Sequence, residues 1–200
     1  MDRADMVKKL KGKLTEKRFI HSIGVEYTAA SLAFVYGEDV QRARIAGLLH
    51  DCAKCIPKDE KLKKSKKLGL PINESEKADP DLLHGKLGAY YAKEKYGVKD
   101  EGILSAITWH TTGHPGMSML DKIIFVADYI EPNRKMIRDL DIIRKEAYED
   151  IDKCIIHILK NTLEYLHEKQ AIIDETTEQT FYYYVDNRVI DEIKSVTTEY

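Results

Sequence analysis

Apolar residues recur every three or four positions along most of the chain, which is the period of an α-helix with one buried face. Most of the glycines and prolines lie where this period stops, as Gly37, Gly97 and Pro132 do. The predicted helices cover about residues 15–36, 39–51, 58–67, 79–96, 100–110, 118–130 and 140–169, the last and longest with an interruption near residue 147. The pattern therefore predicts an all-α fold.

The last thirty residues follow this pattern less clearly. Residues 176–184 are rich in Thr and Tyr, which favours a strand locally, whereas residues 189–196 have a helical pattern. We expect a tail that is mixed or short-helical. A chain of 200 residues is long enough for one sizeable core, so we expect a single domain over residues 1–170 and a C-terminal extension over residues 171–200.

Composition narrows the classes of function that we expect for the chain. The chain is 43% hydrophobic and 33% charged, which are globular values, and its net charge of −2 lacks the basic excess of a protein that binds duplex nucleic acid. The lysines of residues 58–67 have no aromatic residues between them for base stacking, so we interpret the segment as a solvated helix face. No apolar run is as long as a membrane span and the N-terminus lacks a signal-peptide pattern, so we expect a cytoplasmic protein without a membrane partner.

Three cysteines are an odd number, which fits a reducing compartment better than a disulfide framework. Cys52 and Cys55 have C-x-x-C spacing, but no second cysteine pair completes a zinc site. Cys154 lies at helical spacing among isoleucines, and we interpret it as a small core residue.

Histidines and aspartates offer a different set of metal ligands. His50 and Asp51 are adjacent at the point where an apolar helix stops, and His21 lies on the helix before it. Asp128 follows the apolar run Ile123–Ala127, where a carboxylate without a cation would be costly to bury. A set of nitrogen and oxygen donors without thiolates suits iron, manganese, zinc or cobalt.

This set resembles the H…HD…D signature of the HD-domain metallophosphohydrolases: His21, the pair in Leu48-Leu49-His50-Asp51, and Asp128. Longer motifs resemble the YqeK family of HD-domain hydrolases, and the resemblance extends in order over about residues 15–175. The motifs that carry it are residues 18–25, 47–54, 84–89, 106–113 and 128–134. It implies an HD-domain helical bundle that hydrolyses diadenosine tetraphosphate symmetrically to two ADP.

The resemblance also implies residue roles. The metal ligands would be His21, His50, Asp51 and Asp128, and the ion that we expect is iron, with manganese, cobalt or zinc as alternatives. The catalytic residues would be Asp51, His84 and His110. The residues in contact with substrate phosphates would be Arg18, His21, Lys54, His84, His110, Asp128 and Arg134.

The roles of His84 and His110 have an alternative. The two histidines could hold a second ion bridged by Asp51, or they could contact phosphate and protonate the leaving nucleotide. We prefer the phosphate contact. The cations Arg18, Lys54 and Arg134 lie close to the ligands in sequence, so we expect them around the ligands to neutralise phosphate charge.

The expected partners are a dinucleoside polyphosphate and an ADP- or GDP-like product. The chain departs from the family beyond Gln170, where a longer Tyr-rich end could complete the nucleotide site. One alternative is an HD phosphohydrolase that acts on a deoxynucleoside triphosphate or a cyclic dinucleotide. Another is a binding-only regulatory module, against which the complete ligand set argues. The sequence leaves the oligomeric state open.

Overall fold

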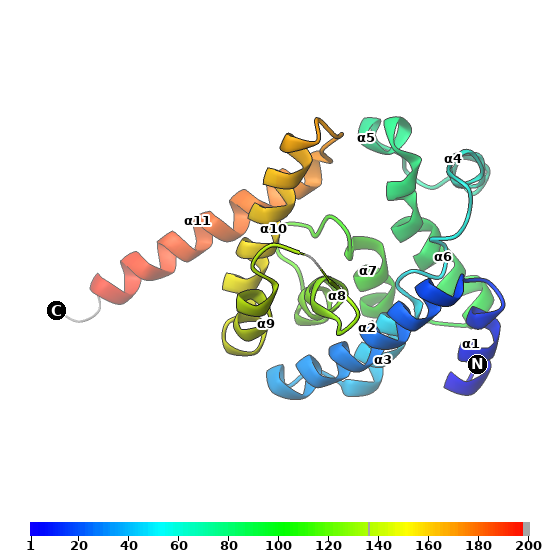
Figure 1. The fold of residues 1–200 in the computed structure, drawn as a ribbon, viewed down its shortest axis with the longest axis horizontal. Helices are drawn as coiled ribbons and strands as arrows, with labels where there is room; N and C mark the ends of the chain where they lie inside the picture. The colour runs from blue at the N-terminus through cyan, green and yellow to red at the C-terminus, as the bar shows by residue number, and fades with distance from the viewer. Residues whose placement is uncertain (136, 198–200) are drawn as a thin grey trace.

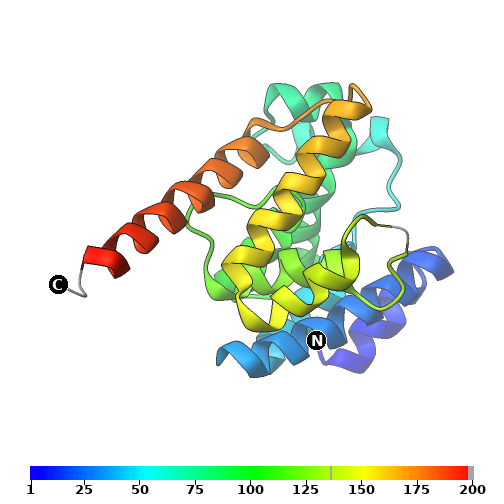
Figure 2. The ribbon, with the colours of Figure 1, turned by 60° about the vertical axis from the view of Figure 1, so that its left-hand side comes forward.

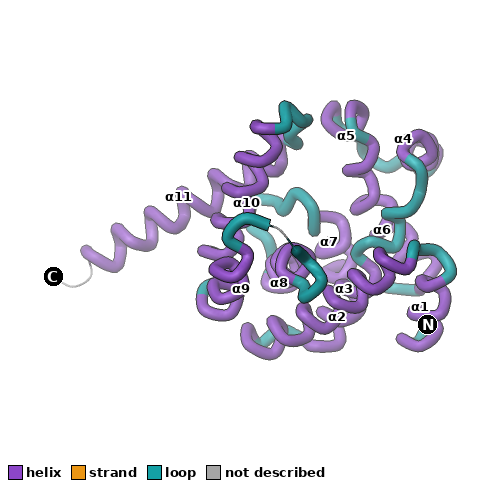
Figure 3. The backbone as a smooth tube through the Cα atoms, viewed as in Figure 1, coloured by secondary structure: helices purple, strands orange, loops and turns teal. Residues whose placement is uncertain are grey.

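The computed structural model describes residues 1–135 and 137–197, with side chains described up to residue 190. Helices joined by loops make up these two ranges, and no strand occurs in them, which confirms the all-α prediction (Figures 1 and 3). The elements are α1 (Arg3–Lys11), α2 (Glu16–Tyr36), α3 (Val40–Leu49), α4 (Lys58–Lys67), α5 (Glu74–Ala78), the 3₁₀ helix η1 (Pro80–Leu83), α6 (His84–Tyr96), α7 (Glu101–Trp109), α8 (Met119–Ile130), α9 (Leu140–Glu149), α10 (Ile151–Glu168) and α11 (Glu175–Thr197). None of these helices is both long enough and apolar enough to cross a membrane.

Capping residues explain why the predicted boundaries are close to the observed ones. The Thr15 side chain accepts a hydrogen bond from the backbone N–H of Arg18 at the start of α2, and Asp39 caps α3 in the same way. Gly37 ends α2 in the left-handed conformation, with φ of 69°, which favours glycine. Local signals of this kind can be recognised from sequence alone.

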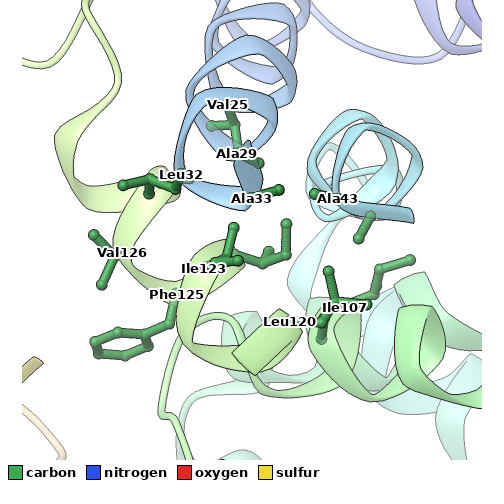
Figure 4. Packing of buried hydrophobic residues seen from close by; sticks show 14 of the residues in the cluster. Val25, Ala29, Leu32, Ala33, Ala43, Ile107, Leu120, Ile123, Phe125 and Val126 are labelled. Carbon is green, nitrogen blue, oxygen red and sulfur yellow. The ribbon is translucent and has the colours of Figure 1, made fainter. Parts of the chain in front are cut away.

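Helix α8 forms the centre of the main core. It packs against α2, α3, α7 and α10, and its apolar residues are buried on almost every side. Figure 4 shows Leu120 and Ile123 of α8 among side chains from α2, α3 and α7, including Leu32 and Ile107. This packing fixes the C-terminal end of α8, where Asp128 lies.

A smaller core joins α4 and η1 to α6 around the buried residues Ala53, Leu83 and Leu87. Helix α4 is the basic segment, and Lys63 on it is solvated as predicted. The prediction is wrong for Lys61, whose side chain is only 1% exposed. Lys61 can be buried because its ammonium group has a carboxylate and a backbone carbonyl as partners.

The C-terminal third differs most from the expectation. The break in the predicted helix over 140–169 falls at Asp150, which caps α10 by accepting from the N–H of Lys153. The predicted strand propensity of 176–184 is overridden, and a single helix, α11, follows and is longer than α10. Thr177, Thr180 and Tyr184 recur at helical spacing and are buried.

Helix α11 begins against α10 and then extends away from the body of the molecule in both views (Figures 1 and 2). The loop between α10 and α11 follows the expected boundary at residue 170, but a division of the chain there stays a prediction. Residues 198–200 of the expected extension lie outside the described residues.

Candidate metal centre

Six side chains from five helices or their ends meet in the interior. Five of them are at most 7% exposed, and the sixth, Asp128, is partly buried. They are His21 on α2, His50 and Asp51 at the end of α3, His84 at the start of α6, His110 directly after α7, and Asp128 on α8. All six are residues that the sequence nominated.

One half of this centre joins α2, α3 and α8. The Nε2 atom of His21 lies 3.0 Å from Oδ1 of Asp128 and 3.3 Å from Nε2 of His50. Nε2 of His50 lies 3.3 Å from Oδ2 of Asp51. His21, His50 and Asp51 present donor atoms that all lie within 4.8 Å of one another, so one ion could contact all three.

The other half joins α3, α6 and α7. The second carboxylate oxygen of Asp51, Oδ1, lies 3.4 Å from Nε2 of His84 and 3.7 Å from Nε2 of His110. The two Nε2 atoms are 3.0 Å apart. Asp51 therefore faces both halves, one oxygen to each.

The Nδ1 atom of each of the four histidines lies close to a hydrogen-bond acceptor of its own. Nδ1 of His50 lies 2.7 Å from the carbonyl of Gly47, and Nδ1 of His110 lies 2.8 Å from the carbonyl of Ile107. His84 contacts the Asp81 carbonyl in the same way, and Nδ1 of His21 lies 3.1 Å from the carboxylate of Glu131. A carbonyl can only accept, so Nδ1 carries the proton and a neutral ring leaves a lone pair on Nε2.

These tautomers make the centre rich in lone pairs. Four Nε2 atoms and the oxygens of two carboxylates face one another, and they would repel unless protons or a metal cation lay between them. Nitrogen and oxygen donors at this spacing fit a divalent metal. Among the residues that the structure describes, the groups that could hold an ion consist only of His and Asp.

The cysteines lie outside this set. Cys52, Cys55 and Cys154 are all free, and the Cys52 thiol donates to the carbonyl of Gly88. Burial raises the pKa of Cys52 to about 12, so it does not supply a thiolate at neutral pH. Cys154 is fully buried in the core, as predicted.

Two glycines permit the close approach of the segments that hold the histidines. A Cβ atom on Gly24, one turn along α2 from His21, would lie 2.4 Å from an oxygen of Glu131. A Cβ atom on Gly85 would lie 2.4 Å from the carbonyl of Thr108 on α7. Side chains at these positions would push the ligands apart.

Both carboxylates of the centre are held in the ionised form. Burial alone would raise the pKa of Asp51, but the positive charge of a protonated His50 and a hydrogen bond donated by His110, where protons take the place of a metal cation, outweigh burial and hold the pKa well below its usual range. Burial would also raise the pKa of Asp128, and the contact with His21 and the charge of Arg134 lower it well below that range. Ionised carboxylates are the state that binds a metal cation.

The three predicted cations are near the centre, but two of them contact the ligands themselves. Arg18 Nη1 lies 2.6 Å from Asp51 Oδ2, and Arg134 Nη2 lies 2.7 Å from Asp128 Oδ1. Arg18 and Arg134 thus lie closer to the carboxylates than the sequence indicated, because an anionic centre attracts the nearest guanidinium groups. Lys54 pairs instead with Asp81, at 2.8 Å, and its Nζ is 3.5 Å from Nδ1 of His84.

A cavity of about 570 Å³ opens beside His21. Four cationic side chains line it: Lys17, Arg18, Arg134 and Lys135. A second cavity, of about 470 Å³, also contacts Arg134 and has an aromatic lining that includes Tyr129 and Tyr165. A cationic cavity beside an aromatic one is suited to an anion that carries a ring.

Sequence reasoning missed residues that support the centre. Glu131 is 1% exposed and orients His21, and its other oxygen accepts from the backbone N–H of Asn133. Its position three residues after Asp128 was the available signal. The Thr111 hydroxyl, 3.2 Å from Nε2 of His84, was also missed.

The three remaining histidines lie elsewhere. His114 is 3.5 Å from Asp121, His157 pairs with Glu146, and His167 is exposed on α10.

The chain is similar to proteins that are already known. Residues 18–133 match the model of the HD domain family. The symmetrical bis(5'-nucleosyl)-tetraphosphatase of Bacillus subtilis is 40% identical over 181 residues, covering 90% of this chain and 96% of that protein. Its counterpart in Staphylococcus aureus is 38% identical over 188 residues, covering 91% and 95%.

A solved structure is also similar. The crystal structure of a Clostridium acetobutylicum protein, described as a predicted HD superfamily hydrolase involved in NAD metabolism, matches with a TM-score of 0.91 and 38% identity. The match covers 94% of this chain and 98% of that one.

Proposed function

Since the chain belongs to the HD domain family and, within it, to the YqeK family of symmetrical bis(5'-nucleosyl)-tetraphosphatases, we propose that it hydrolyses diadenosine tetraphosphate symmetrically. Water adds to one of the two central phosphorus atoms, the P–O bond between the second and third phosphates breaks, and the leaving ADP receives the proton. One water is consumed and two ADP are released.

The observation that carries this proposal is the convergence of four histidine Nε2 atoms on two carboxylates, an arrangement that needs protons or a metal cation between the facing atoms. Such a centre fits a divalent cation, and the Lys and Arg side chains that contact its carboxylates, among the described residues, are Arg18 and Arg134. We assign His21, His50, Asp51 and Asp128 as metal ligands and iron as the ion, with manganese, cobalt or zinc as alternatives. When bound, such an ion lowers the pKa of water and polarises a phosphoryl oxygen.

The cations supply the charge that a tetraphosphate requires. Arg18 and Arg134 have about a third of their side chains exposed and line the 570 Å³ cavity, where Lys17 and Lys135 join them. Each guanidinium has N–H groups beyond the one that contacts a carboxylate, and planar forks of this kind suit phosphate oxygens. Lys54 approaches the bridging phosphates from the side of His84.

His84 and His110 are proposed to contact the phosphates, and with Asp51 they form the catalytic set. One of them would donate a proton to the leaving ADP, and the negative charge of the bound substrate favours its protonated form. Their Nε2 atoms together with Oδ1 of Asp51 could instead hold a second ion, because they lie within 4.8 Å of one another. The number of ions per chain separates the two roles.

The nucleoside end of the substrate fits the cavity lined by Tyr129 and Tyr165, which adjoins Arg134. We also propose that the C-terminal extension completes the nucleotide site, since Asp174 and Thr176 line a small cavity together with Thr111, whose hydroxyl lies 3.2 Å from His84. The free cysteines support a reducing, cytoplasmic setting.

Product analysis tests the proposal. Metal-loaded protein is incubated with diadenosine tetraphosphate, and the products are separated by chromatography. We expect ADP alone. AMP with ATP would mean asymmetrical cleavage, and no turnover would favour a binding-only module. Release of tripolyphosphate from a deoxynucleoside triphosphate, or of linear products from a cyclic dinucleotide, would favour another HD phosphohydrolase.

A matched pair of histidine variants controls this experiment. His50→Gln should abolish turnover, whereas His167→Gln, which alters an exposed histidine on α10, should leave it unchanged. Turnover that survives in His50→Gln would contradict the proposed centre.

A further inference from the structure

A lysine that the histidine centre does not use is buried close to it. Lys61 is 1% exposed, and its helix, α4, packs against η1, which contributes Leu83 to the small core. Its ammonium group donates to the backbone carbonyl of Lys54, at 3.0 Å, and to Oδ1 of Asp81. Burying an ammonium group carries a desolvation cost that its hydrogen-bond partners must offset.

The two carboxylate oxygens of Asp81 accept hydrogen bonds from two different lysines. Oδ1 accepts from the buried Lys61, and Oδ2 accepts from Lys54 at 2.8 Å, while the backbone carbonyl of Asp81 accepts from Nδ1 of His84 at 2.5 Å. Burial would raise the pKa of Asp81, but the hydrogen bonds from the two lysines outweigh it and lower the pKa. One residue thus holds both Lys54 and His84 at the edge of the centre.

The formal charges of this group have a consequence for Lys54. A lone Lys54–Asp81 pair would be neutral and would attract a polyphosphate weakly. With Lys61 the group of two lysines and one aspartate carries +1. Because Lys61 is closed off from solvent and Lys54 is about a quarter exposed, the excess positive charge is presented at Lys54, on the side of His84.

A purely mechanical role is a weaker explanation. A neutral unbranched side chain such as Met would fill the same space against the small core, and buried ion pairs replaced by apolar residues often lose no stability. Packing α4 against η1 therefore does not require an ammonium group.

We propose that Lys61 is a positioning and charge-compensating residue, which holds Lys54 through its carbonyl and through Asp81 and leaves Lys54 a net positive charge for the polyphosphate. This inference rests on the proposed function for the identity of the substrate. It names two residues, Lys61 and Asp81, that act on the substrate only through Lys54 and His84.

The test compares three variants with the wild-type chain. Lys61→Met removes the buried charge and keeps the volume. Lys61→Met/Asp81→Asn removes both charges, so that Lys54 keeps a neutral acceptor and its own charge. Lys63→Met is the matched control, because it removes an exposed lysine from the same helix, where the side chain is 79% exposed and pairs only with Asp59 among the described residues.

Two quantities are measured for each protein. One is KM and kcat for diadenosine tetraphosphate. The other is the affinity for inorganic tripolyphosphate by calorimetry, in metal-loaded and in chelator-treated protein. We expect Lys61→Met to raise KM and to weaken tripolyphosphate binding about tenfold, with kcat within about threefold, because it removes one unit charge near the phosphates. The double variant should return both to within about threefold of wild type, and Lys63→Met should match wild type.

If Lys61 had only a structural role, the variants would show a different order of affinities for tripolyphosphate. The double variant would then bind tripolyphosphate as weakly as Lys61→Met or more weakly, and this result would overturn the proposal. Wild-type affinity for tripolyphosphate in Lys61→Met would also overturn it. If Lys61→Met does not fold, Lys61→Gln removes the charge while its amide can still donate to Asp81 and to the Lys54 carbonyl, and it should show the same tenfold loss.

Failure of the proposed function is distinguishable from failure of this inference. A wild-type protein that does not cleave diadenosine tetraphosphate would refute the substrate. The order of tripolyphosphate affinities among the variants would still decide the role of Lys61.

Discussion

The two halves of the metal centre differ in their exposure and in their partners. On the side of α2 and α8, Asp128 pairs with Arg134, both are partly exposed, and Arg134 lines a cavity of about 570 Å³. On the side of α6 and α7, His84 and His110 are at most 3% exposed, and backbone carbonyls hold both rings. The exposed cation of the first half can exchange partners, whereas the two rings of the second half are held by backbone carbonyls.

This difference separates two tasks of a phosphohydrolase. Side chains that bind and release a polyphosphate must reach solvent and change partners, and Arg18 and Arg134 meet that condition. Groups that hold a fixed geometry during the reaction are better placed where neighbouring atoms determine their rotamers. The exposed cations of the first half are therefore expected to bind and release phosphate, whereas His84 and His110 keep a fixed position against it.

The largest expected effect follows removal of the carboxylate in the exposed half. Asp128→Ala should lose the metal and lower kcat/KM by at least about 10³-fold, since a ligand and an anchor for Arg134 disappear together. The fold should survive, because α8 is held by its apolar neighbours. Metal content by elemental analysis and circular dichroism check both points. Asp141→Ala, on the exposed face of α9, is the control, and stoichiometric metal in Asp128→Ala would show that another carboxylate is the ligand.

The next effect concerns Arg134, which should matter for phosphate and not for the metal. Arg134→Ala should lower kcat/KM about 10²- to 10³-fold while the metal content stays the same. Arg134→Lys should recover only part of this loss, because an ammonium group keeps the charge without the planar fork. Lys145→Ala, an exposed change on α9, should have no effect. Loss of metal from Arg134→Ala would place this residue in the metal site instead.

A smaller effect tests the buried half. His110→Gln should lower kcat about 10²-fold as a phosphate contact or proton donor, with unchanged metal stoichiometry. The measurement is the number of ions per chain beside the rate, with His167→Gln as the matched histidine change. A drop of one ion per chain would instead make His110 a ligand of a second ion and would contradict the preferred role.

The last effect concerns stability instead of activity, and it is a dependence of the free energy of unfolding on pH. Burial, together with the nearby charges of Lys54 and His110, lowers the pKa of His84 to about 3 from an ordinary value of 6.5. The unfolded chain therefore binds a proton between these values that the folded chain does not. The stability that His84 contributes is present above about pH 6.5 and is lost as the pH falls toward 3, by up to about 1.4 kcal/mol per pH unit.

Urea unfolding of chelator-treated protein at several pH values measures this dependence. His84→Gln should flatten the fall in the free energy of unfolding, whereas His167→Gln should follow the wild-type curve. Identical slopes for His84→Gln and wild type would contradict the lowered pKa.

Much of the fold was predictable because its signals are local. Thr15, Asp39 and Ser118 cap helices where the sequence placed helix starts. The tail was predicted wrongly because the strand propensity of its Thr and Tyr residues is weak compared with burial of Thr180 and Tyr184 along one helix face. Tertiary packing of this kind leaves no local signal.

The candidate site also has a part that the sequence predicts and a part that it does not. The six residues of the centre were nominated by type and motif, and the structure brings them together. The direct pairing of Arg18 with Asp51 and the burial of Lys61 depend on distances between separate helices. Spacing along the chain does not contain such distances, so these contacts became visible only in the fold.

Elemental analysis of the wild-type protein, purified without chelators or oxygen, tests the central claim most directly. The lone pairs that meet at the centre predict one divalent ion per chain, with turnover of diadenosine tetraphosphate lost on chelation and restored by iron or manganese. A protein that holds no divalent ion and keeps its full activity in the presence of chelator would contradict the account.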